Sequence, residues 1–128
     1  MISHWTYRTQ PWDKPYPEIL RDHLYGFVYI ITRITDGKLY VGKKSLHTLR
    51  RKAKHESAWR TYMGSSMDLS FDIATMSKSA FTFNIIEFSS TPKYLDYLEI
   101  KHLIGNDVLR VNSYNKAIWG PHFERGDI

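Results

Sequence analysis

The chain of 128 residues contains no cysteine, so neither a disulfide framework nor a thiolate metal site can form. No apolar stretch approaches the roughly 18 residues that a membrane-spanning helix requires. The first residues, Met-Ile-Ser-His-Trp-Thr-Tyr-Arg, lack the apolar core of a secretory signal. These absences predict a protein that has no membrane partner and that we expect in the cytoplasm.

Acidic residues are scarce in one segment of the chain. Residues 33–60 contain nine Lys or Arg but only two acids, Asp36 and Glu56, which gives this segment a charge of +7 within a total of +5. A basic stripe of this kind is typical of a surface that binds a polyanion. Charge alone leaves open whether the partner is nucleic acid or whether the stripe is a solvated face with an incidental basic bias.

The hydrophobic fraction of 42% predicts one folded domain with a modest core. Residues 1–25, rich in Pro and aromatic side chains, are expected to form an extended arm without regular structure. Trp5, Trp12 and Tyr16 in this arm could stack on bases, although packing against the domain is the favoured interpretation. Residues 26–33 and 38–42 are expected to form a hairpin around the turn signal Asp36-Gly37.

The remaining elements follow from local signals. Residues 46–60 are expected to form a helix that carries the basic stripe, and Ser65 or Ser66 is expected to cap a second helix over 67–77. Residues 81–88 are expected to form a third strand, and a helix beginning at Pro92 is expected to end near Gly105-Asn106. The fold class is therefore predicted to be α+β. A three-stranded, antiparallel-type sheet is flanked by helices, and residues 119–128 form a tail.

The hairpin contains two triplets that resemble a known family. Phe27-Val28-Tyr29 and Tyr40-Val41-Gly42 are similar to the two motifs of the GIY-YIG endonuclease superfamily, with Phe27 at the usual Gly position and Gly26 one place earlier. Residues 59–66 and 81–87 also resemble its phage and homing branch. The resemblance covers residues 26–118 and implies a small GIY-YIG nuclease domain. It also suggests a bacteriophage or mobile-element origin, and hence the host-cell cytoplasm.

The resemblance extends to three single positions and to a cofactor. Arg50, ten residues after Tyr40, matches the family's essential Arg, Glu99 matches its metal-binding Glu, and Asn115 matches its structural Asn. The implied activity is a divalent-metal-dependent DNA endonuclease that uses Mg²⁺ or Mn²⁺. Because one such site cuts one strand, a double-strand break requires a homodimer or two successive cuts.

The chemistry of these residues suits phosphodiester hydrolysis. Glu99 offers one hard oxygen ligand, which suits Mg²⁺ with its retained waters, and Arg50 can direct two donors at a phosphate. Tyr29 is the preferred base for the attacking water, with Tyr40 hydrogen-bonding the water or the phosphate. The expected nucleic-acid contacts are Lys43, Lys44, Arg50, Arg51, Lys54 and His55, and the secondary candidates for the site are His47 and Gly42.

Each of these residues also has a plainer explanation. A lone helical Glu is most often a solvated surface residue, and a Tyr in a strand is more often core than catalytic. Two other functions therefore stay open. The chain could be a non-catalytic nucleic-acid-binding module, which the altered first triplet favours, or an interaction protein whose basic segment binds an acidic partner. For the endonuclease that the resemblance implies, the expected partner is double-stranded DNA.

Overall fold

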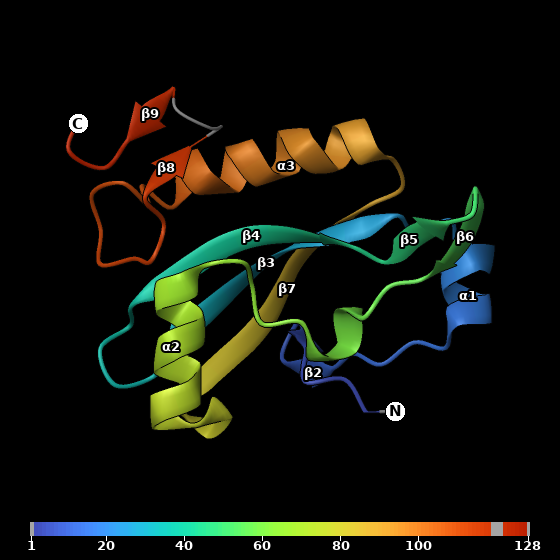
Figure 1. Ribbon diagram of the computed structural model, residues 1–128, viewed down its shortest axis with the longest axis horizontal. Helices are drawn as coiled ribbons and strands as arrows, with labels where there is room; N and C mark the ends of the chain where they lie inside the picture. The colour runs from blue at the N-terminus through green and yellow to red at the C-terminus, as the bar shows by residue number, and fades with distance from the viewer. Residues whose placement is uncertain (1, 119–121, 128) are drawn as a thin grey trace.

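A computed structural model describes residues 2–118 and 122–127. Its centre is a five-stranded mixed sheet in the order β2-β1-β7-β3-β4, with α3 on one face and α2 and the N-terminal segment on the other (Figure 1). The sheet strands are β1 (Thr6–Tyr7), β2 (Gln10–Pro11), β3 (Gly26–Arg33), β4 (Leu39–Ser45) and β7 (Phe81–Ser89). The α-helices among the described residues are α1 (Tyr16–Arg21), α2 (Met67–Met76) and α3 (Pro92–Gly105).

The α+β class and most elements were predicted correctly, whereas the size of the sheet was not. The expected hairpin, third strand and two later helices all form, and Ser66 caps α2 by accepting a hydrogen bond from the Leu69 N–H. The three-stranded sheet was wrong because the N-terminal segment supplies two further strands. One of them, β1, pairs in parallel with β7, so the sheet is not purely antiparallel.

The N-terminal 25 residues contain regular structure, contrary to the expectation of an extended arm. They form β1, β2 and α1, and they bury Trp5, whose side chain is 1% exposed. The Trp5 indole N–H donates to the Trp59 carbonyl at 2.7 Å, and the rings of Trp12 and Trp59 pack 5.0 Å apart. Trp5 and Trp12 therefore pack against the domain, as the favoured interpretation predicted.

Residues 46–60 form a β-ribbon rather than the predicted helix. Strands β5 (His47–Arg50) and β6 (Ala53–Glu56) pair antiparallel, and a 3-10 turn, η1 (Trp59–Thr61), follows. A helix over this segment would need an apolar stripe to bury. Only Leu46 and Trp59 are buried there, one at each end, so the residues between them can remain solvated on a projecting ribbon.

Alternation along β3 divides the core into two layers. Phe27, Tyr29 and Ile31 point to the face that packs on Trp5 and Trp59, and Val28 points to the face covered by α3. Strand β3 lies inside the sheet between β7 and β4, and β4 forms one edge of the sheet. The register places Tyr29 opposite Gly42 and Ile31 opposite Tyr40.

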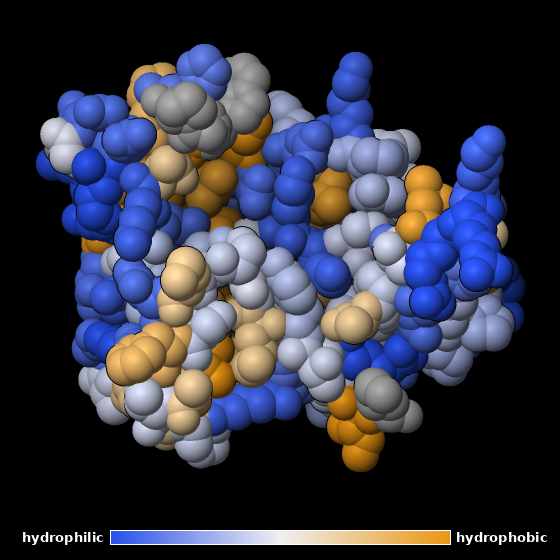
Figure 2. Space-filling view, viewed as in Figure 1, coloured by the Kyte–Doolittle hydropathy of each residue, from blue (hydrophilic) through white to orange (hydrophobic). Residues whose placement is uncertain are grey.

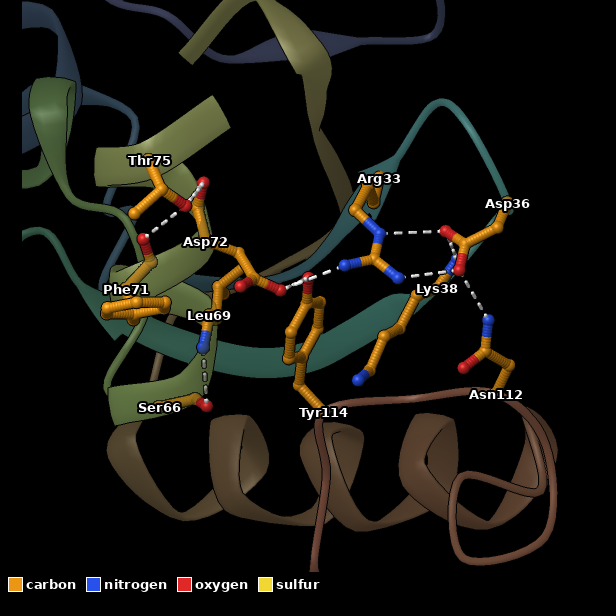
Figure 3. Close-up of polar contacts among 10 residues, drawn as sticks. All are labelled: Arg33, Asp36, Lys38, Ser66, Leu69, Phe71, Asp72, Thr75, Asn112 and Tyr114. Atoms are coloured by element: carbon orange, nitrogen blue, oxygen red, sulfur yellow. Dashed lines mark hydrogen bonds and ion pairs between the residues drawn. The ribbon is translucent and has the colours of Figure 1, made fainter. Parts of the chain in front are cut away.

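A polar network fixes the hairpin turn, far from the ribbon. Arg33 binds Asp36 through two nitrogens and also binds Asp72 of α2 at 2.9 Å (Figure 3). The Tyr114 hydroxyl donates to Asp72 at 2.6 Å, and the Asn112 amide donates to Asp36. This network ties the turn, α2 and the segment after α3 into one unit, which keeps β4 in register at the sheet edge.

We predict that His4 makes stability sensitive to acid. Its Nε2–H donates to the Tyr62 carbonyl, its ring stacks on Phe83, and its buried Nδ1 has no hydrogen-bond partner among the described residues. Burial, aided by Lys78, lowers the pKa of His4 from 6.5 to about 4. The unfolded chain therefore binds the extra proton first. The stability that neutral His4 provides is complete above pH 6.5 and is lost as the pH falls toward 4.

Urea denaturation at pH 7.5 and pH 5 measures this effect. From pH 7.5 to pH 5, the free energy of unfolding of wild type should fall by on the order of 1–2 kcal/mol more than that of His4→Phe. The matched control is His23→Gln, because His23 is exposed on the same N-terminal segment. An acid sensitivity that is the same in wild type and His4→Phe would refute the assignment.

Candidate active site

The contact of Tyr29 with Gly42 joins the two halves of the hairpin. Tyr29 is 1% exposed, and a Cβ at Gly42 would collide with its hydroxyl and lie 2.6 Å from its Cζ. Burial raises the pKa of Tyr29 well above its ordinary value, with smaller contributions from Tyr40, Tyr62 and Glu99. Gly42 is therefore needed because the Tyr29 ring occupies the space of its missing side chain.

Tyr40 lies next to Tyr29 but closer to the surface. Their ring centroids are 6.2 Å apart, and the Tyr40 hydroxyl shares a hydrogen bond of 2.9 Å with the Ser65 hydroxyl. Gly64 precedes this serine with a φ of +86°, and a Cβ there would lie 3.2 Å from the Tyr40 ring. The loop before α2 thus holds both the ring and the hydroxyl of Tyr40.

Glu99 is a half-buried carboxylate on α3. Burial raises its pKa, while Lys43 lowers it and Asp96 raises it. Within the described ranges, Glu99 accepts no hydrogen bond and forms no ion pair. Its negative charge contributes to the raised pKa values of both Tyr29 and Tyr40, so the three side chains lie within electrostatic reach of one another at the β4 edge.

Two lysines of β4 supply positive charge near the first turns of α3. Lys43 forms an ion pair with Asp96 of α3, and its pKa is raised by Asp96 and by Glu99 against the opposing effect of burial. Lys44 lies over the Tyr62 ring at 4.4 Å, and burial lowers its pKa. Lys43, Lys44 and Tyr62 line a cavity of about 260 Å³ between β4 and the first turn of α3.

The Asn115 side chain binds the outer edge of β4. Its Oδ1 accepts the Val41 N–H at 3.0 Å, and its Nδ2 donates to the Val41 carbonyl at 2.9 Å. Nearby, Leu39 exchanges backbone hydrogen bonds with Asn112 and Tyr114. The segment 112–115 therefore closes the sheet edge as far as Val41, next to Gly42 and Lys43, and an unpaired strand edge is satisfied without a further strand.

The structure does not bring Arg50 to Glu99. Arg50 lies at the end of β5, opposite Ala53, and lines a cavity of about 410 Å³ with Arg51 and His55. The cation that lowers the pKa of Glu99 is Lys43. Arg50, Arg51 and Lys54 are exposed on the ribbon, where Lys54 lies on the other face from Arg50 and lines a separate cavity with His47.

His47, a secondary candidate, is occupied within the fold. Its Nδ1 accepts from the Tyr16 hydroxyl at 2.6 Å, and its Nε2–H donates to the Leu24 carbonyl at 2.9 Å. Both ring nitrogens are therefore used to join the ribbon to α1. His55 faces the other side of the ribbon, beside Arg50.

The residues at the β4 edge fit a hard divalent cation that keeps most of its waters. The described residues contain no group of three or more His, Asp or Glu side chains that could enclose a metal ion. Glu99 instead offers one carboxylate that has no hydrogen bond or ion pair within residues 2–118 and 122–127, and Mg²⁺ accepts one such ligand when water and phosphate oxygens complete its shell. Asp96, one turn earlier, is engaged with Lys43.

Sequence comparison identifies the family. A family model described as "Putative endonuclease segE, GIY-YIG domain" matches residues 5–119. The chain therefore belongs to the GIY-YIG endonuclease family. Members of this family generally use divalent metal ions, and membership implies a nucleic-acid substrate. The searches of curated proteins and of solved structures gave no match. None of the described helices is long and apolar enough to cross a membrane.

Sequence reasoning missed three side chains around the site, namely Ser65, Tyr62 and Asp96. Gly64-Ser65-Ser66 was interpreted only as a chain break and helix cap, yet Ser65 contacts Tyr40. Asp96 had a usable signal, because it lies three residues before Glu99 and so on a neighbouring part of the same helix. Tyr62 had none, because its proximity to Tyr29 depends on the unexpected ribbon.

We predict that Asn115→Ala destabilises the fold by about 2–4 kcal/mol, because it leaves two buried backbone groups of Val41 without partners. The matched control is Asn112→Ala, which removes one exposed hydrogen bond to Asp36 and should cost less than about 1 kcal/mol. Equilibrium unfolding in urea measures both. Equal costs for the two variants would show that Asn115 is not an anchor of the strand edge.

Proposed function

We propose that the protein is a divalent-metal-dependent DNA endonuclease that hydrolyses phosphodiester bonds through one site at the β4 edge. The observation that carries the proposal is the position of Glu99. Among the described residues it is a half-buried carboxylate without a hydrogen bond or ion pair, and it lies on α3 three residues after Asp96, which pairs with Lys43 of β4. No contact among the described residues explains the burial of this carboxylate, and a half-buried carboxylate suits a bound metal ion.

Glu99 would hold Mg²⁺ or Mn²⁺, and a substrate phosphate would complete the shell. When bound, the ion supplies Lewis-acid stabilisation of the charge that develops on the phosphate and on the leaving oxygen. Lys43 and Lys44 line the adjacent cavity and attract the substrate's phosphates into it. Because Lys44 lies over Tyr62 and is partly desolvated, its attraction for a phosphate is less screened than that of a surface lysine.

Of the two tyrosines, Tyr40 is better placed to contact the attacking water. The sequence favoured Tyr29 as the base, but Tyr29 is buried. Burial raises its pKa well above the ordinary value, which moves it further from neutrality. Tyr40 is half-buried and its hydroxyl is held by Ser65. We assign to Tyr40 the orientation of the water and to Tyr29 the support of the Tyr40 ring and of Gly42.

The non-catalytic alternative loses its main argument in the structure. It relied on Phe27 in place of the first Gly of the motif, but Phe27 is fully buried against Trp5 and faces away from α3. Close approach of α3 is provided by Gly26, where a Cβ would lie 2.8 Å from the Leu95 side chain and 2.6 Å from the Lys44 carbonyl oxygen. Phe27 therefore fills the core and leaves the β4 edge unchanged.

The proposal predicts metal-dependent nicking of supercoiled plasmid that Glu99→Gln abolishes. We expect a loss of at least about 100-fold with Mg²⁺ or Mn²⁺, and no cleavage by wild type in EDTA. Because burial disfavours the charged carboxylate, Glu99→Gln should unfold at the same temperature as wild type or higher. Glu18→Gln, on the surface of α1, is the control and should cleave normally. Wild-type nicking by Glu99→Gln would refute the proposal.

The two tyrosine variants separate the proposed roles. Tyr40→Phe should lower the single-turnover cleavage rate by about 10²–10⁴ without changing duplex binding in EDTA. Tyr29→Phe should retain cleavage within about tenfold, because the buried Tyr29 hydroxyl lies against Gly42. The opposite pattern, with Tyr29→Phe inactive and Tyr40→Phe active, would make Tyr29 the base.

A further inference from the structure

The turn of the β5–β6 ribbon consists of two basic residues whose backbone adopts the left-handed conformation, which is unfavourable for residues with a Cβ. Arg51 and Lys52 have φ values of +53° and +62°. Two-residue turns of this kind are most often formed by Asn-Gly, because side chains with a Cβ are strained in the left-handed region. Strain that persists at a surface position suggests a functional reason for the residues that carry it.

The ribbon concentrates positive charge at its free end. Arg50, Arg51, Lys52 and Lys54 are exposed and, within the described part of the chain, form no ion pair. The ribbon's own acid, Glu56, lies at the base and binds Arg60 and the Trp59 indole. Figure 2 shows hydrophilic side chains gathered on the projection where Figure 1 places β5 and β6. These four cations are therefore exposed to solvent and, among the described residues, do not stabilise the fold through ion pairs.

The base of the ribbon is anchored, in contrast to its end. The Leu46 N–H donates to the Tyr25 carbonyl, the Ser57 N–H donates to the Leu46 carbonyl, and the Ser57 hydroxyl donates to the Ser45 carbonyl at 2.6 Å. His47 adds its hydrogen bonds to α1 and to Leu24. A projection anchored at its base holds the backbone of its free end in place, so little of the chain has to be ordered on binding.

We propose that the β5–β6 ribbon enters the major groove of a DNA duplex while the β4 edge lies on the neighbouring backbone. The major groove, about 12 Å wide, admits a two-stranded ribbon, whereas the minor groove, about 6 Å wide, does not. The nine Cα–Cα steps from Gly42 to Arg51 span at most about 32 Å, which is less than one turn of the duplex, so one DNA molecule reaches both sites.

The side chains at the end of the ribbon suit the major groove in particular. Arg50 and Arg51 can each direct two donors at the O6 and N7 atoms of guanine. Leu49, which is 73% exposed and pairs across the ribbon with Lys54, can contact the methyl group of thymine. This assignment gives Arg50 a binding role in place of the catalytic role that its sequence position implied. It relies on the proposed function only for the choice of DNA as partner.

The double substitution R51N/K52G tests the proposal because it should change stability and binding in opposite directions. It installs the favoured turn residues, so the melting temperature should rise, while duplex affinity in EDTA should fall at least tenfold at about 0.1 M salt. The slope of log K against log salt should decrease in magnitude by about 2. R21Q/R110Q removes the same charge from exposed positions elsewhere and should change affinity less than threefold.

Groove ligands and single strands complete the test. Methyl green, which occupies the major groove, should compete with wild type for the duplex, and netropsin, which occupies the minor groove, should not. A single strand of the same sequence should bind at least tenfold more weakly than the duplex. Unchanged affinity of R51N/K52G, an equal loss in R21Q/R110Q, competition by netropsin alone, or preference for the single strand would each overturn the proposal.

This outcome is separable from that of the proposed nuclease. If R51N/K52G binds the duplex as wild type does while Glu99→Gln abolishes cleavage, the ribbon proposal fails and the nuclease proposal stands. If R51N/K52G loses affinity while wild type cuts no plasmid with either metal, the ribbon proposal stands and the nuclease proposal fails.

Discussion

The arrangement of the site depends on the Tyr29 ring lying against Gly42 across the β3–β4 pair. This contact fixes the second motif on the first, and it can form only because residue 42 has no side chain. The Glu99 carboxylate, on the face covered by α3, raises the pKa of both Tyr29 and Tyr40, although burial is the larger cause for each. The spacing of the two motifs is therefore a packing requirement before it is a catalytic one.

The sequence predicted the elements whose signals are local. The hairpin from residue 26, the cap at Ser66 and the helix after Pro92 follow from turn residues, capping residues and alternation. The ribbon was missed because its positive charge was interpreted as a helix face, although the segment has no apolar stripe, and its Arg51-Lys52 turn lacks the usual Asn-Gly signal. The extra strands β1 and β2 are two residues long and are defined by their pairing with β7, which no local pattern reveals.

The candidate site was predicted in part for the same reason. Family resemblance pointed to Tyr29, Tyr40, Glu99 and Asn115, and the fold brings all four to the β4 edge. Arg50 does not join them, because the ribbon carries it away from α3. The burial that separates Tyr29 from Tyr40, and the contact of Tyr40 with Ser65, depend on how the N-terminal segment and the loop before α2 pack, and spacing in the sequence does not contain that information.

Charge is divided between two surfaces with different tasks. Lys43 pairs with Asp96 and the half-buried Lys44 lies over Tyr62, whereas the ribbon cations are solvated and without such partners in the described structure. Partly desolvated charges act strongly at short range, and solvated charges bind in a salt-dependent way. This difference supports the two proposals, that phosphodiester hydrolysis takes place at the β4 edge and that the ribbon binds the duplex.

The central claim, that a divalent metal ion binds at Glu99 beside the motif tyrosines, is tested most directly by Mn²⁺ titration with NMR detection. The paramagnetic ion should broaden the backbone amide signals nearest Glu99, including those of Gly42 and Lys43, while the ribbon signals keep their intensity. The same titration of Glu99→Gln should leave the signals around residue 42 sharp. Broadening that is unchanged in Glu99→Gln, or that is centred away from the β4 edge, would contradict the account.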